Sequence, residues 1–327
     1  MTELVTGLGM LDFDSVEEAL VARPSQMVSV SPETWDVLWR AWEGGALEQD
    51  FRISWENGRA FFEAADGLRG RRPLVIEWKG SHRAPGDEVA PVDLRIDHVF
   101  LVSCKYLSKI MINASPFHLF ERLLQGGHGV RSADWYSHVA ASEYRDLYES
   151  VLAEMNLDDL PRRVEDLSAV DRERLSRSLG GGWPSGTEKV LGEFVAAVAS
   201  ATAQRWQDLT STPGESEALM WRMLRMGSAP YFVLGASSTS LLRLRIATPW
   251  DWRLSFRMRS FRSAPQPGGQ PRVGWVAGVE DRHSGRLHEI EGHVEIRWSH
   301  GRFNGNPEAK VYLDTPHSQV PGYFPLA

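Results

Sequence analysis

The chain has 327 residues, of which 42% are hydrophobic, so it can bury a core as one large domain or two ordinary ones and is not a disordered protein. Its single cysteine excludes an internal disulfide and a zinc centre built from cysteines. Residues 1–10 lack the basic and apolar regions of a signal peptide, and no apolar run approaches about 18 residues, so we expect a cytoplasmic protein with no membrane span.

Charge is distributed unevenly along the chain, whose formal net charge is -7. Residues 229–327 contain 12 basic and 8 acidic residues, a balance of +4, whereas the rest of the chain contains 24 basic and 35 acidic residues, a balance of -11. This asymmetry indicates an anionic partner for the C-terminal part.

Residues 1–70 are predicted to form a mixed, largely helical N-terminal segment. Ser15 is a typical N-cap, with Glu18 three residues later, and Ser31 followed by Pro32 predicts a second helix start. Asn57-Gly58 predicts a hairpin turn, although a short helix containing Glu63 fits the same residues. The second helix carries an aromatic stripe that we assign to the core: Trp35, Leu38, Trp39 and Trp42.

Residues 71–130 are predicted to be three strands followed by a helix. The apolar runs at 73–76, 92–96 and 99–102 are the strands, and residues 81–91 form a loop. Asp97-His98 is either a tight turn between two short strands or part of one long strand. The helix after Tyr106 is expected to bury Ile110, Met111, Phe117, Phe120, Leu123 and Leu124.

Residues 131–228 are predicted to be a helical region, which we interpret as an insertion. The expected helices cover residues 142–155, 160–179, 185 onward and 216–226. After it, the strand that contains Tyr231 and Gly235 is expected to rejoin the sheet of residues 71–130.

Residues 229–327 are predicted to be a β-rich, basic C-terminal part. Strands are expected at residues 241–248, 252–261, 273–276 and 293–298. Alternation along the second of these leaves Leu254, Phe256 and Met258 for the core. Four tryptophans, Trp250, Trp252, Trp275 and Trp298, either stack on bases or fill the core. One row of arginines suits a phosphate backbone: Arg243 and Arg245, then Arg253, Arg257 and Arg259, with Ser255 among them.

Carboxylates and lysines gather at the predicted strand ends of residues 71–106. Magnesium or manganese prefers hard oxygen ligands from one or two carboxylates, and a bound divalent ion activates water for attack on a phosphodiester. A nearby lysine offsets the developing charge. The candidate residues are Glu77, Lys79, Asp93, Asp97 and Lys105.

This pattern resembles the core of the PD-(D/E)xK nuclease superfamily. That family has an acidic residue on one strand, Glu/Asp-x-Lys at the end of the next, and then a helix; Asp93 or Asp97 followed by Ser103-Cys104-Lys105 fits this order. Ser103 departs from the pattern, and in some restriction enzymes with Ser-x-Lys a glutamate from the following helix takes its place. Glu121 is the candidate here, and Glu77 is the alternative.

A second register of the same motif exists. Asp66 followed by Glu77-Trp78-Lys79 matches the orthodox pattern, but residues 80–91 look like a loop where the family has a helix. Cys104, which points away from its two neighbours on a strand, is expected in the core and not as a nucleophile.

The resemblance implies a mixed α+β fold with a restriction-endonuclease-like core, a helical insertion and a β-rich C-terminal part. It implies a Mg²⁺- or Mn²⁺-dependent DNA endonuclease of restriction or anti-phage defence, with Asp93, Asp97, Glu77 and Glu121 as metal ligands and Ser103, Lys105 and Lys79 beside them. Double-stranded DNA is the expected partner, and a protein partner in a defence complex or a homo-oligomer fits the same role. The alternative is an inactive nuclease-like protein that binds DNA or a protein. A carbohydrate-active protein, suggested by 13 tryptophans, is disfavoured by the arginine row.

Overall fold

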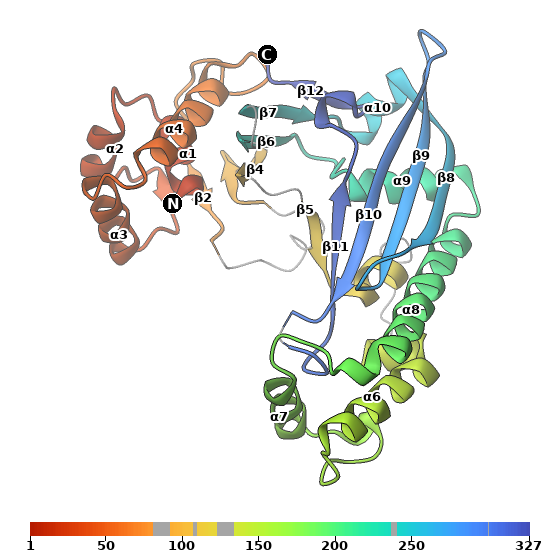
Figure 1. Ribbon diagram of the computed structural model, residues 1–327. Helices are drawn as coiled ribbons and strands as arrows, with labels where there is room; N and C mark the ends of the chain where they lie inside the picture. The colour runs from red at the N-terminus through yellow and green to blue at the C-terminus, as the bar shows by residue number, and fades with distance from the viewer. Residues whose placement is uncertain (81–91, 107–109, 123–133, 237–240, 300) are drawn as a thin grey trace. The chain divides into compact units, whose positions relative to one another are not determined.

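A computed structural model describes residues 1–80, 92–106, 110–122, 134–236, 241–299 and 301–327. The chain forms two compact units, each assembled from separate segments (Figure 1). The predicted segments 71–130, 131–228 and 229–327 are each divided between the units. The first unit comprises Met1–Lys109, Leu224–Phe256 and Pro316–Ala327, and the second comprises Ile110–Met223 and Arg257–Thr315.

The first unit is built on a mixed seven-stranded sheet with the order β1-β2-β3-β4-β6-β7-β12. Strands β2, β3 and β4 form an antiparallel meander, β6 pairs with β4 in parallel, and β7 returns antiparallel to β6. The pairing of β6 with β4 agrees with the expectation that Tyr231 and Gly235 rejoin the preceding strands. The strands are β1 (Met27–Val28), β2 (Ile76–Trp78), β3 (Leu94–Ile96), β4 (Phe100–Tyr106), β6 (Tyr231–Ala236), β7 (Leu241–Ile246) and β12 (Tyr323–Pro325).

One face of this sheet forms the core of the first unit. Phe61 of α4 meets the rings of Phe100 on β4 and Phe232 on β6 at centroid distances of 5.7 Å and 4.9 Å. Ile76 and Ile96 are also fully buried in this core. The helices of the unit are α1 (Thr2–Gly9), α2 (Val16–Ala22), α3 (Pro32–Glu43), α4 (Glu48–Glu63), α10 (Pro249–Ser255) and the 3₁₀ turn η4 (His317–Gln319).

Both predicted helix starts in residues 1–70 are confirmed. The Ser15 hydroxyl accepts the N–H of Glu18 at the start of α2, and Ser31 caps α3, whose first residue is Pro32. The predicted hairpin at Asn57-Gly58 is wrong, because α4 runs through both residues. The helical alternative for this stretch is confirmed, and it leaves Asn57 buried with its amide on the Gly235 carbonyl at 3.0 Å.

The contact between α1 and α4 explains why a glycine lies inside a helix. A Cβ on Gly58 would overlap the carbonyl oxygen of Thr6 and approach the Cα of Gly9 to 2.9 Å. Two glycines at the crossing therefore let the helix backbones touch, and this close approach outweighs the lower helix propensity of glycine.

The second unit contains a five-stranded sheet with the order β5-β11-β10-β9-β8. Its inner face is apolar: Val273, Trp275 and Ala277 on β9 lie beside Val294 and Ile290 on β10, and all five are buried. The strands are β5 (Ile110–Ala114), β8 (Phe256–Gln266), β9 (Arg272–Asp281), β10 (Leu287–Arg297) and β11 (Glu308–Leu313).

The longest helix, α8, packs on this sheet. The Ser263 hydroxyl of β8 donates to the carbonyl of Ala203, and the side-chain amide of Gln207 donates to the Ser263 carbonyl, at 3.0 Å and 2.8 Å. The helical elements of the unit are η1 (His118–Arg122), α5 (Trp135–Val139), α6 (Ala141–Met155), η2 (Val164–Asp166), α7 (Ala169–Leu179), η3 (Ser185–Thr187), α8 (Glu188–Leu209) and α9 (Pro213–Met223).

The predicted mixed α+β class is confirmed, since each unit combines a sheet with helices. Besides the hairpin at Asn57-Gly58, two predicted elements are wrong. Residues Ile110–Ala114 form a strand and not the start of a helix, because β5 pairs antiparallel with β11, which lies far away in the sequence. Residues 107–109 and 123–133 of that prediction lie outside the described residues, and so does the whole predicted loop at residues 81–91.

The predicted strand at residues 252–261 is the other error, because its first part is helix α10. Thr248 and Asp251 form a reciprocal capping box, and Pro249 occupies the first turn. These local contacts favour a helix start. As a consequence Leu254 is 55% exposed, where the strand prediction had placed it in the core.

A glycine-to-alanine change inside a helix normally raises stability, but the Gly9–Gly58 contact predicts that it lowers stability at Gly58. Gly58→Ala should lower the free energy of unfolding by about 1–3 kcal/mol because the added methyl overpacks the helix crossing. Gly192→Ala in α8 is the matched control, since a Cβ there meets nothing within 4 Å. The control should raise stability by about 0.5–1 kcal/mol through helix propensity. Chemical denaturation of both variants measures this, and a stabilised Gly58→Ala protein would contradict the close contact.

Candidate functional site

The two strands β3 and β4 bring Asp93 next to the Ser-x-Lys segment. Leu94 pairs with Val102, so Asp93 lies opposite Ser103. The Asp93 carboxylate accepts the N–H of Cys104 at 2.6 Å and the hydroxyl of Ser103 at 3.2 Å. Its position is therefore fixed by the backbone of the strand that carries Lys105.

Alternation along the strands separates a buried face from a charged one. Val102 and Cys104 point into the core, whereas Ser103 and Lys105 point to the opposite face. Cross-strand register puts the charged residues of β2 and β3 on that same face. We call this surface the polar face, defined by Glu77, Lys79, Asp93, Arg95, Ser103 and Lys105.

Cys104 lies where the sequence predicted. Burial raises the pKa of its thiol well above the ordinary value, and the carboxylates of Asp93 and Glu3 raise it further. A thiol held neutral in this way is a poor nucleophile, so the cysteine acts as a small core residue.

Glu77 and Lys79 belong to the polar face but are engaged with each other. The Lys79 ammonium lies 3.1 Å from one Glu77 oxygen, and the Arg95 guanidinium lies 3.6 Å from the other. The N–H of Lys79 also donates to the carbonyl of Asp93 at 3.0 Å. Glu77 is thus already paired with two cations and is a weaker candidate ligand than Asp93.

The second register of the motif does not converge on one site. Asp66 pairs with Arg245 of β7 at 3.4 Å, whereas Glu77 is on β2. Strands β3, β4 and β6 lie between β2 and β7, so four strand spacings of about 4.8 Å separate the two strands by roughly 19 Å. Asp66 and Glu77 therefore cannot share a metal ion.

Asp97 has a structural role at the opposite end of the hairpin. Asp97 and His98 have φ of 49° and 59°, which confirms the tight turn between two short strands. The Asp97 carboxylate accepts the N–H groups of Leu74 and Val75 and lies 2.7 Å from Arg71. Six residues of β4 lead from this turn to Lys105, roughly 20 Å at about 3.3 Å each, so the two residues are not in one site.

Glu121 belongs to the second unit, on the π-helical turn η1. Its carboxylate lies 3.6 Å from Arg205 and 3.6 Å from His138, both in the same unit. Within the first unit, the residues that the hairpin brings together are Asp93, Ser103 and Lys105, with Glu77 and Lys79 on the neighbouring strand.

Glu3 is a functional candidate that sequence reasoning missed. It lies in α1 and accepts the indole N–H of Trp78 at 2.6 Å. Burial raises the pKa of Glu3, the hydrogen bond from Trp78 lowers it, the negative charge of Asp93 raises it, and the positive charges of the N-terminus and Lys105 lower it. Glu3 therefore shares the electrostatic environment of Asp93 and Lys105. A sequence signal existed, because Glu3 is the one charged side chain in residues 1–10.

Arg225 is the second missed residue. It is 3% exposed, has φ of 62°, and donates to the Ser103 hydroxyl at 3.3 Å and to the Tyr231 hydroxyl at 2.9 Å. A buried guanidinium thus stands where the family pattern would place a carboxylate on residue 103. Its signal in the sequence was an arginine between Leu224 and Met226 in an apolar run.

The predicted arginine row is not one row. Arg253 and Ser255 lie in α10 of the first unit, whereas Arg257 and Arg259 lie on β8 of the second. Arg243 and Arg245 do share a face of β7, opposite Leu244 and Ile246. They serve the internal structure: Arg243 donates to Asn57 at 2.8 Å, and Arg245 pairs with Asp66 and lies over the Phe324 ring.

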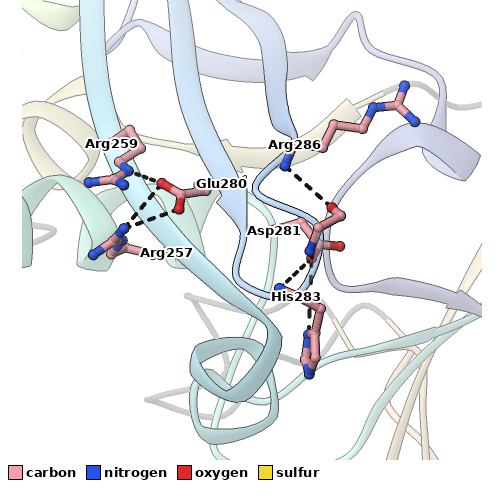
Figure 2. A network of polar contacts seen from close by, with 7 residues as sticks. Arg257, Arg259, Glu280, Asp281, His283 and Arg286 are labelled. Carbon is pink, nitrogen blue, oxygen red and sulfur yellow. Dashed lines mark hydrogen bonds and ion pairs between the residues drawn. The ribbon is translucent and has the colours of Figure 1, made fainter.

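Figure 2 shows what holds Arg257 and Arg259. Both guanidinium groups bind the carboxylate of Glu280 on β9, Arg257 at 3.1 Å. The hydrogen bond from Arg259 is the main cause that lowers the pKa of Glu280, and Arg257 adds to it. Nearby, Asp281 accepts the N–H of His283 and closes the turn between β9 and β10. One carboxylate thus offsets half of this local positive charge.

The polar face offers few ligands for a hard divalent cation. In the described part of the chain, no group of three or more His, Cys, Asp or Glu side chains could hold a metal ion. Magnesium needs only one or two carboxylates, because it keeps several waters. Asp93 alone supplies one such carboxylate on the polar face, since Glu77 is already paired with Lys79 and Arg95.

Comparison with known proteins found no matching family model, no matching curated protein and no matching solved structure. Among the described residues, no helix has both the length and the apolar character needed to cross a membrane. The function must therefore be argued from the geometry of the chain itself.

The turn at Asp97 predicts a defined loss of stability in acid. Burial alone would raise the pKa of Asp97, but hydrogen bonds from the Val75 N–H, Arg71 and the Leu74 N–H lower it below its ordinary value of 3.8. Because the folded-state pKa is the lower one, the stabilisation is complete above about pH 4 and is lost as the pH falls through the folded-state value.

Asp97→Asn should keep the turn, since asparagine tolerates a positive φ, but should lose about 1 kcal/mol at pH 7 with the charged hydrogen bonds. Its stability should then fall less than that of the parent protein between pH 7 and pH 3. Asp146→Asn, at an exposed position of α6, is the control and should follow the parent protein. Urea titrations at pH 7 and pH 3 measure the free energy of unfolding of the three proteins. An equal decrease in all three would refute the role of the Asp97 charge.

Proposed function

We propose that the polar face binds the phosphate backbone of DNA and hydrolyses a phosphodiester with the aid of Mg²⁺ or Mn²⁺. The observation that carries the proposal is the junction of Asp93 and Lys105. The Asp93 carboxylate accepts the N–H of Cys104, the residue that immediately precedes Lys105 on β4. This is the relation that the resemblance to PD-(D/E)xK nucleases calls for.

The charge of the polar face favours an anionic substrate. It carries three cationic side chains, Lys79, Arg95 and Lys105, and two acidic ones, Glu77 and Asp93. Arg225, hydrogen-bonded to Ser103, adds a further cation. An excess of positive charge around a fixed carboxylate suits a phosphate that approaches with a divalent ion.

The roles of the residues follow from their positions. Asp93 would hold the divalent ion, which when bound polarises the phosphate and activates water. Lys105 would face the phosphate and stabilise the charge that develops on its oxygens. Arg225 would keep the Ser103 hydroxyl on Asp93 and so fix the orientation of that carboxylate.

The catalytic proposal predicts a strong effect of Lys105 and Asp93 on cleavage. Lys105→Ala and Asp93→Asn should each reduce the rate of duplex cleavage by about 100-fold or more, because each removes a charge that acts on the reacting phosphate. Lys189→Ala is the matched control, since the Lys189 side chain is 88% exposed on α8. The assay follows a labelled DNA duplex with Mg²⁺, with Mn²⁺ and with a chelator, and circular dichroism checks the fold.

Normal cleavage by both folded variants would sink this assignment. Loss of activity in Lys79→Ala with full activity in Lys105→Ala would instead move the chemistry to the Glu77–Lys79 pair. A restriction or anti-phage role follows only from the resemblance, and cleavage of foreign but not of host-modified DNA would support it.

A second function, that of an inactive nuclease-like protein that binds DNA or a protein partner, is favoured by Arg225. Its buried guanidinium lies 3.3 Å from the Ser103 hydroxyl, which in turn is 3.2 Å from Asp93. A protein-supplied cation beside the carboxylate reduces the attraction for a metal ion. Tight DNA binding that is lost in Lys105→Ala, with no cleavage under any metal condition, would select this alternative.

The DNA proposal also predicts a role for Arg257 and Arg259 that does not depend on activity. If both contact phosphates, the double change to alanine should lower the slope of log affinity against log salt by about 1.8, since each phosphate contributes about 0.9. Arg174→Ala with Arg177→Ala is the control, because these arginines are likewise ion-paired, on α7. Binding titrations at several salt concentrations measure the slope, and an unchanged slope would leave only a solvated sheet face.

A further inference from the structure

The second unit contains a pocket of about 390 Å³ that takes no part in the proposed hydrolysis. Its walls come from α5, the segment that follows α7, the N-terminal part of α8, the turn between β8 and β9, the end of β10 and the residues after it. All of its lining residues belong to this one unit. The volume lies within the range of small-molecule sites.

One wall of the pocket is aromatic. Trp298 packs against Tyr136 at a centroid distance of 4.7 Å, against Trp183 at 5.8 Å, and against Phe194 at 5.8 Å with the two rings nearly parallel. Tyr136 and Phe194 are fully buried and hold Trp298 in place, so the half-buried rings of Trp183 and Trp298 supply the aromatic surface that a ligand can reach. Such a surface suits a flat, conjugated ligand.

Two arginines line the same pocket. The Arg302 guanidinium stacks over the Trp183 ring at 4.7 Å and donates to the carbonyls of Gly180 and Gly181 at 3.0 Å and 2.7 Å. Arg297 lies at the last position of β10. Within the described part of the chain, neither arginine has a carboxylate within 4.0 Å, and no lining residue is acidic.

Three arginines on β8 of the same unit differ from Arg297 and Arg302 in this respect. Arg257, Arg259 and Arg262 on β8 all have a glutamate partner. In the pocket, two positive charges are instead left for a ligand to neutralise. Partial burial even lowers the pKa of Arg302, which reflects the cost of holding its charge away from water.

Polar groups for recognition are present as well. Tyr136 is fully buried, lines the pocket, and its hydroxyl has no hydrogen-bond partner among the described residues. Gln270 adds an amide side chain. The glycines at 180, 181 and 269 have open space where a Cβ would stand, so a ligand can approach their backbone closely.

From these features we infer that the pocket binds a nucleoside monophosphate group, with the base against Trp183 and Trp298 and the phosphate on Arg297 and Arg302. A purely apolar ligand would leave both guanidinium groups unpaired, and a metal ion would find no carboxylate, histidine or cysteine among the lining residues. The group could be supplied by a free mononucleotide or by one nucleotide of a single strand. The inference rests on the second unit alone and stands independently of the hydrolytic site.

Calorimetry with the full-length protein tests the inference. The probes are AMP, GMP, CMP and UMP, with adenosine and inorganic phosphate as partial ligands, and a five-nucleotide DNA strand. We expect at least one monophosphate or the strand to bind, and adenosine to bind at least about tenfold more weakly because it lacks the charged contact. Binding of a free monophosphate identifies a mononucleotide site, and binding of the strand alone identifies a strand-reading site.

The variants are chosen so that misfolding does not decide the result. Arg297→Gln should weaken binding about tenfold or more, and Trp183→Leu should weaken it by a similar factor through loss of stacking. Arg302→Lys keeps a charge but loses the stacked, forked geometry and should also weaken binding. Arg262→Gln is the matched control, since Arg262 is 70% exposed on β8 and lies outside the pocket.

Two outcomes would overturn the inference. One is the absence of binding heat for every nucleotide probe at millimolar concentration with a folded protein. The other is equal affinity of the parent protein, Arg297→Gln and Trp183→Leu for the probe that binds. Lys105→Ala changes the first unit and leaves this pocket intact. A Lys105→Ala protein that binds nucleotide but does not cleave DNA therefore tests the pocket independently of the proposed hydrolysis.

Discussion

The parallel pairing of β4 with β6 is the constraint on which the first unit depends. Parallel neighbours cannot be joined by a tight turn and need a crossover connection. Here the segment between them, Ile110–Met223, supplies much of the second unit. The pairing sets Lys105 beside Gly235, where a Cβ would collide with the Lys105 backbone, so glycine is required for the strands to approach. It also brings Tyr231, and with it Arg225, to Ser103.

The same pairing holds the charged groups of the polar face in fixed positions, as the proposed chemistry requires. Strands fix the backbone on both sides of Ser103, and the Asp93 carboxylate takes a backbone N–H as well as a hydroxyl. A charged group held by rigid elements has little freedom to reorganise, which is what electrostatic catalysis needs. Ion pairs such as Glu77–Lys79 show the competing use of the same residue types, which is to neutralise one another.

Features set by neighbours in the sequence could be predicted, and those set by distant partners could not. The caps at Ser15 and Ser31 could be predicted because a few adjacent residues decide them, whereas the turn at Asp97-His98 was one of two interpretations that the sequence left open. The capping box at Thr248 is equally local, so that error was avoidable. The strand Ile110–Ala114 depends on β11, and the close contact of Gly58 with α1 accounts for a glycine inside helix α4. No local pattern contains either partner.

The candidate site shows the same division at the level of single residues. Alternation correctly separated Cys104 from its neighbours, because the period of a strand is a local property. Which carboxylate accompanies Lys105 was not decided locally. Asp93 and Asp97 both precede it within one hairpin, yet the hairpin register puts only Asp93 beside Ser103. Glu3 and Arg225 reach this neighbourhood from segments before and after the three strands. A charged residue in an otherwise apolar stretch carries a desolvation cost that must be offset by a partner, and that cost is the sequence-level reason to look for such a partner first.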